Sequence, residues 1–174
     1  MPGLADRERL ARFMRALGEA AQLETRVYLT GGASAVLFDW RKTTIDVDLT
    51  FEPESDEIFR AIATLKDQLQ VNVELASPAH FIPAVPGWQS RSIFIRREGK
   101  ASFYHYDFYS QALAKIERGH AQDLNDVACM VEAGLVDRKQ LPEFFDRLAG
   151  DLPRYPAISV DKFRSAVKAA AALS

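Results

Sequence analysis

The sequence predicts an α+β protein in which a mixed β-sheet with flanking helices is followed by a helical C-terminal part. Short segments with alternating apolar residues, typical of strands, occur between residues 25 and 106 and are separated by segments with helical spacing. After Phe108 only helical periodicity follows. The chain has 174 residues, of which 48% are hydrophobic and 26% charged, as in ordinary globular proteins. This order of elements is typical of the α+β class.

The first part contains the expected strands. They are expected at 26–30, 45–51, 71–76, 93–97 and 101–106. The last two are expected to form a hairpin around Glu98-Gly99-Lys100. Helices are expected at 4–22 and 54–69, with a short one after Gly31-Gly32 that runs to Phe38. Segment 77–88 has three prolines and is expected to be a loop.

The second part is expected to be a helical bundle. Its helices are expected at 109–119, 122–134, 138–150 and 159–173. Gly119 and Gly134 are suited to end the first two of them. We therefore expect an α/β core with an N-terminal helix over residues 1–108 and a helical region over 109–174. The sequence leaves open whether the two form separate domains or one compact unit.

The overall charge and the cysteine content exclude several classes of protein. A net charge of −2 gives no general attraction to nucleic acid or to an anionic membrane. The single cysteine, Cys129, rules out an intrachain disulfide. No apolar run has the length of a membrane span, and the charged N-terminus differs from a signal peptide. We expect a soluble, cytoplasmic protein.

Two aspartates stand out within the strand expected at 45–51. Asp46 and Asp48 are two positions apart, so both side chains lie on the same face of the strand. Like charges at this spacing repel each other. A divalent cation removes the repulsion, because it prefers hard oxygen ligands that lie close together. The alternatives are an exposed face with scattered charges, or carboxylates held by arginines such as Arg41 or Arg91.

Two further motifs extend this hypothesis. Gly31 and Gly32 lie between a strand and a helix, where backbone N–H groups can approach a phosphate and the Ser34 hydroxyl adds a donor. A tight turn is the plainer interpretation of these glycines. If the strand at 71–76 lies beside the aspartate strand, Glu74 completes a cluster of three carboxylates that can hold two metal ions.

The stretch LTGGASAVLFDWRKTTIDVDLTF resembles the signature of the nucleotidyltransferase (DNA polymerase β-like) superfamily. The signature consists of Gly-Gly or Gly-Ser, a gap of about ten residues, and Asp-apolar-Asp. Thirteen residues separate Gly32 from Asp46 here. The chain is most similar to small bacterial members of the AbiEii and MenT toxin type. The resemblance covers roughly residues 25–135 and implies a minimal nucleotidyltransferase core with a C-terminal helical bundle.

The resemblance also implies roles for residues of the helical part. Lys115 matches a helix lysine that contacts the triphosphate in such toxins, Asp123 matches an aspartate near the nucleotide, and Arg118 would assist. The plainer interpretation is a pair of helices joined by ion pairs, such as Arg118 with Asp123. Asp107 is a rival to Glu74 as the third carboxylate, although its position favours an N-cap for the following helix.

The implied activity is metal-dependent transfer of a nucleoside monophosphate from a nucleoside triphosphate (NTP) to a hydroxyl or phosphate acceptor. Asp46, Asp48 and Glu74 would bind two Mg²⁺ ions, or Mn²⁺ in their place. The toxin-like relatives imply tRNA or protein as the acceptor and an antitoxin as a partner. Two alternatives stay open: an enzyme that modifies a small molecule such as an antibiotic, and an inert module that binds nucleotide or a partner.

Overall fold

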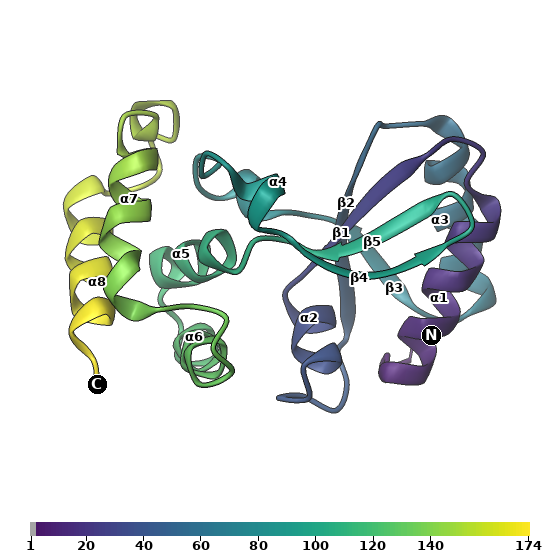
Figure 1. Cartoon of the computed structure of the whole chain (residues 1–174), viewed down its shortest axis with the longest axis horizontal. Coiled ribbons are helices and arrows are strands. Elements are labelled where there is room, and N and C mark those ends of the chain that lie inside the picture. Colours follow the sequence, from purple (N-terminus) through teal and green to yellow (C-terminus); the bar gives the residue numbers. More distant parts are fainter. Residues whose placement is uncertain (1–2) are drawn as a thin grey trace. The chain divides into compact units, whose positions relative to one another are not determined.

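The computed structural model describes residues 3–174 and confirms the α+β class. Within these residues the structure contains a mixed five-stranded sheet of order β3-β2-β1-β5-β4 (Figure 1). The strands are β1 (Thr25–Thr30), β2 (Asp46–Glu52), β3 (Asn72–Leu75), β4 (Ile93–Glu98) and β5 (Ala101–His105). All five lie where the alternating pattern predicts them, and no strand end differs by more than one residue from its predicted position.

The pairing of the strands sets which residues are neighbours. Strand β1 is antiparallel to β2 and parallel to β5, whereas β3 is parallel to β2 and β4 is antiparallel to β5. The last pair is the expected hairpin. The β2–β3 register places Asp48 next to Glu74 and Asp46 next to Asn72. Because alternate residues share a face, these four side chains lie on one side of the sheet.

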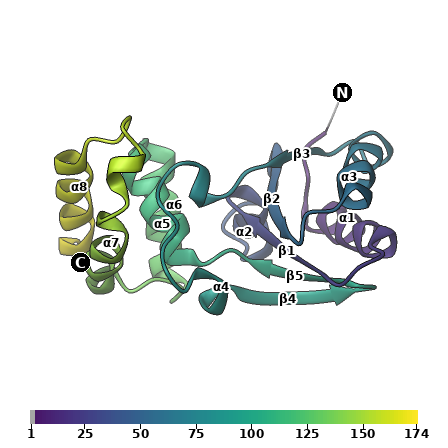
Figure 2. The same cartoon turned by 90° about the horizontal axis from the view of Figure 1, so that it is seen from above.

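The opposite face of the sheet carries the apolar core. Val47 and Leu49 of β2 are fully buried there and pack with residues of three helices. These helices are α1 (Arg7–Ala20), α2 (Gly32–Leu37) and α3 (Asp56–Gln68). Helices α1 and α3 lie side by side (Figures 1 and 2), and α2 contacts β1 and β2. The alternation along β2 thus separates an apolar face from the face that carries both aspartates.

A second compact unit is built almost entirely of helices. Its helices are α4 (Trp88–Arg91), α5 (Phe108–Arg118), α6 (Ala121–Glu132), α7 (Leu141–Ala149) and α8 (Val160–Ala172), with short 3₁₀ turns at Pro78–His80, Arg138–Gln140 and Leu152–Arg154. Helix α5 packs against α6, α7 and α8, and α7 packs against α8. The two predicted stops are present, because Gly119 and Gly134 both have the left-handed conformation that suits glycine.

The chain divides into two compact units. The first contains residues 1–77 and 92–106, and the second contains 78–91 and 107–174. The second unit resumes at residue 107, and the helical region was expected from residue 109. The segment 77–88 was expected to be a loop of the α/β core. Residues 78–91 instead belong to the helical unit and contain a 3₁₀ turn and α4. None of the helices in residues 3–174 combines the length and the apolar character needed to cross a membrane.

Candidate active site

Asp46 and Asp48 lie on the face of β2 that points away from the helices of the first unit. Both residues are half-buried, and the residues between and beside them on the strand, Val47 and Leu49, are buried in the core. Because residues two apart on a strand are separated by about 7 Å, the two carboxylates can approach one ligand from the same side. The expected shared face of the two aspartates is present in the structure.

Glu74 is next to Asp48 across the β2–β3 pair, as expected if the two strands are neighbours. Its side chain is exposed. Between the carboxylates lies Asn72, whose amide donates a short hydrogen bond to Asp46 and a longer one of 3.4 Å to Glu74 Oε1. Asn72 lies two positions before Glu74 and therefore on the same face of β3, and its bond to Asp46 depends on the register of the two strands.

The face that carries Asp46, Asp48 and Glu74 provides some of the ligands that a divalent cation needs, but not a complete set. Across residues 3–174, no three His, Cys, Asp or Glu side chains are gathered as a ready metal site. Asp46 and Asp48 nevertheless provide the two hard oxygen donors that Mg²⁺ usually takes from a protein when substrate phosphates and water supply the rest. The donor set therefore fits a cation that binds together with a polyphosphate, and does not fit a permanent structural ion.

Gly31 and Gly32 form the connection between β1 and α2. Gly31 has φ 62° and ψ −129°, a conformation that residues with a side chain rarely adopt. A Cβ atom at Gly31 would lie 3.2 Å from Asp48 Oδ2, so the backbone of this turn passes directly beside the second aspartate. A Cβ atom at Gly32 would lie 2.0 Å from Thr44 Oγ1. Conformation and packing together require both glycines, and they bring the turn to the carboxylates.

Ser34 has a different position from the one expected for a phosphate ligand. Its side chain is fully buried, and its hydroxyl lies 2.8 Å from Nδ1 of His105. The hydroxyl is therefore bonded inside the first unit, and in this arrangement it cannot contact a phosphate as expected. His105 was not expected in the site, since its partner lies 71 positions away in the sequence.

Burial determines the protonation of His105. The imidazole is 5% exposed, and burial lowers its pKa from 6.5 to about 4 because an imidazolium would lose its hydration. The side chain is thus neutral at pH 7. In the neutral ring, Nδ1 either accepts the Ser34 hydroxyl proton or donates to the hydroxyl oxygen, depending on the tautomer.

The residues expected to contact the triphosphate from the helical unit form ion pairs with one another. Lys115 Nζ lies 2.9 Å from Asp126 Oδ2 and 3.6 Å from Asp123 Oδ1. Arg118 donates from Nε and Nη2 to both oxygens of Asp123. The alternative of two helices joined by ion pairs therefore describes Lys115, Arg118 and Asp123 in this structure. Asp126 completes the cluster. It lies one helical turn after Asp123, and this spacing in the sequence indicates that both aspartates share a face of α6.

The pKa of Asp123 results from opposing effects. Burial raises the pKa, but hydrogen bonds from Arg118 and the positive charges of Arg118 and Lys115 outweigh it, so the pKa lies below its ordinary value. The carboxylate is ionised at pH 7 and neutralises the cations around it. Lys115 would have to leave two acidic partners before it could bind a phosphate.

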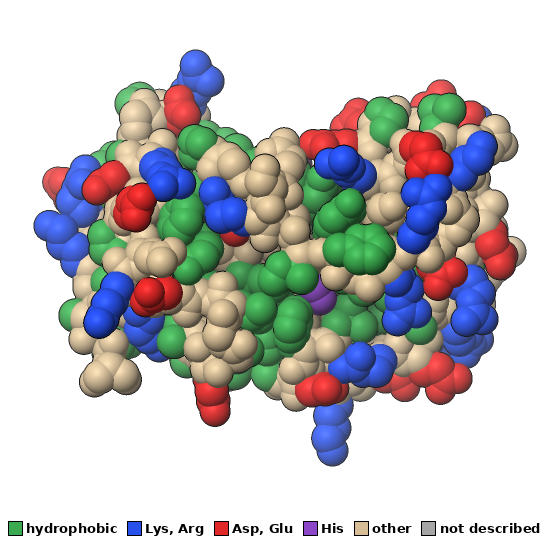
Figure 3. Space-filling view, in the orientation of Figure 1, with side chains coloured by type: hydrophobic (Ala, Val, Ile, Leu, Met, Phe, Trp, Pro, Cys, Tyr) green, Lys and Arg blue, Asp and Glu red, His purple; other side chains and the backbone are tan. Residues whose placement is uncertain are grey.

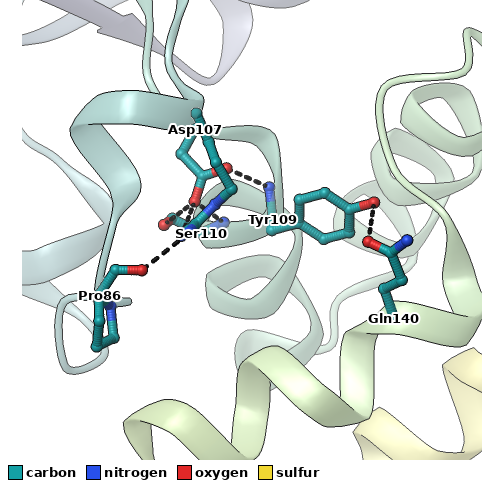
Figure 4. A network of polar contacts seen from close by, with 6 residues as sticks. Pro86, Asp107, Tyr109, Ser110 and Gln140 are labelled. Atoms are coloured by element: carbon teal, nitrogen blue, oxygen red, sulfur yellow. Dashed lines mark hydrogen bonds and ion pairs between the residues drawn. The ribbon is translucent and has the colours of Figure 1, made fainter.

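Asp107 caps α5, as the sequence favoured. Its carboxylate accepts hydrogen bonds from the backbone N–H groups of Tyr109 and Ser110 at 3.2 Å and from the Ser110 hydroxyl at 2.7 Å (Figure 4). Arg91 donates to the same carboxylate at 2.9 Å and to the carbonyl of Pro86 at 2.8 Å. Asp107 is 1% exposed, so its oxygens are committed to this network. Glu74 remains the candidate for the third carboxylate.

Charged side chains of both signs are mixed on the face drawn in Figure 3. Lysine and arginine side chains lie near acidic side chains over both units in this view. Two arginines of β4 have acidic partners: Arg97 pairs with Glu24 at 2.6 Å and Arg96 with Glu98 at 3.9 Å. The hairpin therefore carries balanced charge.

Comparison with known proteins gives these features a context. A family model described as a nucleotidyltransferase of unknown function (DUF6036) matches residues 8–162. The chain belongs to this family. The matched region includes the glycine turn, both aspartates and Glu74, together with the ion-paired helices of the second unit. No curated protein matches the chain.

A solved structure shares the nucleotidyltransferase-like fold. It is the crystal structure of an antigenic nucleotidyltransferase-like protein from Paracoccidioides brasiliensis, which covers 96% of this chain and 95% of its own length. The two are similar with a TM-score of 0.50 and a sequence identity of 15%. At this identity the similarity concerns the fold alone. The family model supports the nucleotidyltransferase superfamily expected from the Gly-Gly and Asp-x-Asp motifs.

Proposed function

We propose that this protein is a metal-dependent nucleotidyltransferase that moves a nucleoside monophosphate from an NTP to an acceptor hydroxyl or phosphate. The observation that carries the proposal is the placement of Asp46 and Asp48 on one face of β2, with the backbone of Gly31 beside Asp48. A family member without activity would have no need to keep two repelling carboxylates at half-buried positions.

Each residue of the face has a distinct task in the proposed reaction. The backbone N–H groups of Gly31 and Gly32 would bind the outer phosphates of the NTP, because glycines allow the backbone to approach closely. Asp46 and Asp48 would hold Mg²⁺ together with the phosphate oxygens. When bound, Mg²⁺ would neutralise the charge that develops on the transferred and leaving phosphates.

Glu74 is proposed as the residue that receives the acceptor proton. It lies next to Asp48 and is exposed, so an acceptor hydroxyl can reach it without rearrangement of the core. A carboxylate in hydrogen-bond contact with the attacking hydroxyl acts as a general base. Asn72 would keep the first carboxylate oriented, since its amide donates to Asp46. Catalysis would rest mainly on positioning and electrostatics.

We propose that three residues of the helical unit contact the nucleotide only after their ion pairs open: Lys115, Arg118 and Asp123. The present pairing joins α5 to α6, and loss of one partner would leave a buried charge unpaired. If the triphosphate displaces Asp126 from Lys115, the variant Lys115→Met should weaken NTP binding while it also destabilises the helical unit. Isothermal titration calorimetry with folded protein separates these effects, and unchanged affinity would limit the cluster to a structural role.

For the acceptor we propose tRNA or a protein, as in the AbiEii and MenT-type toxins that the sequence resembles, with a cognate antitoxin as partner. Incubation of the purified protein with α-labelled NTPs and total RNA tests this proposal. Label in RNA supports a nucleic-acid acceptor, and label in protein supports self-modification or a protein target. Release of pyrophosphate with the α-label recovered as free nucleoside monophosphate, and none in RNA or protein, would show transfer to water and contradict both macromolecular acceptors.

A calorimetric experiment tests the proposed activity before any acceptor is known. Wild-type protein should bind an NTP at least 10-fold more tightly with Mg²⁺ than with EDTA, because the two aspartates repel the phosphates without a cation. The variant Asp48→Asn should lose most of this difference. Equal binding with and without Mg²⁺ would contradict the metal-dependent mechanism.

A further inference from the structure

A buried polar pair lies behind the glycine turn and takes no part in the proposed chemistry. Ser34 Oγ and His105 Nδ1 are 2.8 Å apart, and neither side chain is accessible to a substrate. An apolar pair of similar shape would avoid the cost of removing a hydroxyl and an imidazole from water. An apolar pair would fill the same space, so what the polar pair adds is a contact with a fixed direction.

The imidazole contacts α2 near both ends of the helix. Ser34 is in the first turn of α2, and Phe38 is its C-cap residue. The centroid of the Phe38 ring lies 4.7 Å from that of the His105 ring. His105 itself is fixed at the end of β5, where it pairs with Leu29 of β1. One side chain of the sheet thus contacts both ends of a six-residue helix that is too short to be stable alone.

The position of α2 matters because the glycine turn precedes it directly. The carbonyl of Gly31 accepts the first helical hydrogen bond from Ala35 N–H at 3.1 Å. The same Gly31 lies beside Asp48, since a Cβ atom there would be 3.2 Å from Asp48 Oδ2. A shift of α2 would therefore change the separation between the turn and the carboxylate. Misplacement of about 1 Å can reduce turnover by about 100-fold.

We propose that His105 is a positioning residue of the site, which acts through Ser34 and Phe38 to hold α2 and thereby keeps the Gly31–Gly32 turn beside Asp48. The proposal deepens the proposed function and rests on it. The hydrogen bond sets the first turn of α2, and the ring contact sets its last residue. Neither contact reaches the substrate.

Two variants at one position test the proposal. Asparagine can present its side-chain oxygen where Nδ1 lies and can keep the bond to Ser34, whereas leucine removes the bond and keeps apolar contact. We expect His105→Leu to lower kcat by roughly 10-fold, with a smaller change in KM, and His105→Asn to restore most of it. Ser34→Ala should match His105→Leu, and the double variant should lose no more than either single one.

A stability control separates positioning from simple loss of folding. Leu10→Ala in α1 removes a fully buried side chain outside α2 and destabilises the same unit. Assayed well below its unfolding temperature, this variant should keep wild-type kcat. If Leu10→Ala loses as much turnover as His105→Leu, or if His105→Leu retains full turnover, the positioning role is wrong.

Amide hydrogen exchange decides the proposal independently of activity. The N–H groups of Ala35 and Phe38 bond within α2 at 3.1 and 3.0 Å and report its stability. They should exchange faster in His105→Leu than in His105→Asn, while amides of α3 stay unchanged. Equal exchange in α2 would overturn the role of His105. Wild-type protein without nucleotidyl transfer would overturn the proposed function instead, and the exchange result would still stand.

Discussion

Asp48 is the residue on which the proposed chemistry depends most. Replacing it with asparagine should reduce metal-dependent turnover by at least 100-fold, because the amide is a poor ligand for Mg²⁺. Stability should change little or rise slightly, since one of the facing carboxylates beside Glu74 is removed. Pyrophosphate release and thermal unfolding, measured on the same samples, check both parts.

Glu52→Gln provides the matched control. Glu52 is the last residue of β2, lies four positions after Asp48 on the same face, and is exposed. The substitution makes the same carboxylate-to-amide change on the same strand, but away from the glycine turn. It should keep wild-type turnover. Equal losses in the two variants would indicate a general effect of charge on β2.

His105 gives the first unit a predictable response to acid. Its pKa is about 4 in the folded protein and 6.5 when exposed, so the unfolded chain binds the proton first as the pH falls. Its contribution to the free energy of unfolding should decrease between pH 6.5 and 4, by about 3 kcal/mol in total, and stay constant below. Urea unfolding of wild type and His105→Asn at several pH values measures this difference. Parallel pH profiles would contradict the assignment.

At the scale of elements, the β1–α2 connection depends on close packing of Gly32. A Cβ atom there would lie 2.0 Å from Oγ1 of Thr44, which is buried and fixed by backbone bonds to Ala5. Gly32→Ala should therefore destabilise the unit by roughly 1–3 kcal/mol. Gly150→Ala is the control, because nothing lies within 4 Å of its Cβ position and its backbone is helical. Urea unfolding should show a loss only for Gly32→Ala.

The N-cap of α5 combines helix capping with a buried ion pair. Asp107→Ala removes the acceptor of two backbone N–H groups and leaves Arg91 without this carboxylate. We expect a loss of roughly 2–4 kcal/mol. Asp6→Ala at the exposed N-cap of α1 should lose only about 1 kcal/mol. Comparable losses in the two variants, measured by chemical denaturation, would contradict the importance of the Arg91 contact.

Local patterns predicted most elements because the forces that form them are local. Alternation around Val47 and Leu49 identified β2 and its polar face, and capping by Asp107 followed from its place before an apolar helix. The bond between Ser34 and His105 could not be predicted in this way. It requires the parallel pairing of β1 with β5, which joins segments about 75 residues apart.

The same distinction applies to the candidate site. Glu74 was predicted on the condition that β3 lies beside β2, and the register places it next to Asp48. The sequence left two interpretations of Lys115 open, because a lysine on a helix near several aspartates can bind a ligand or form an ion pair. The structure pairs it with Asp126, which the sequence hypothesis left out.

At the scale of the whole molecule, the chain belongs to a nucleotidyltransferase family, and the charges of the described residues do not single out an acceptor. Net charge is −2, and the arginines of the hairpin are paired with glutamates. Association with RNA through general electrostatic attraction is therefore not expected. If RNA is the acceptor, its transfer rate should fall only modestly between 50 and 200 mM salt, in contrast to a protein with many phosphate contacts.

The most direct test of the central claim is a pair of transfer reactions with one NTP labelled at either the α- or the γ-phosphate. Both contain Mg²⁺, wild-type protein or Asp48→Asn, and total RNA with the purified protein as acceptors. If the protein transfers a nucleotidyl group, the wild type attaches the α-label to an acceptor and releases the γ-label as pyrophosphate. The Asp48→Asn variant does neither. Attachment of the γ-label, or equal transfer by the variant, would contradict the account.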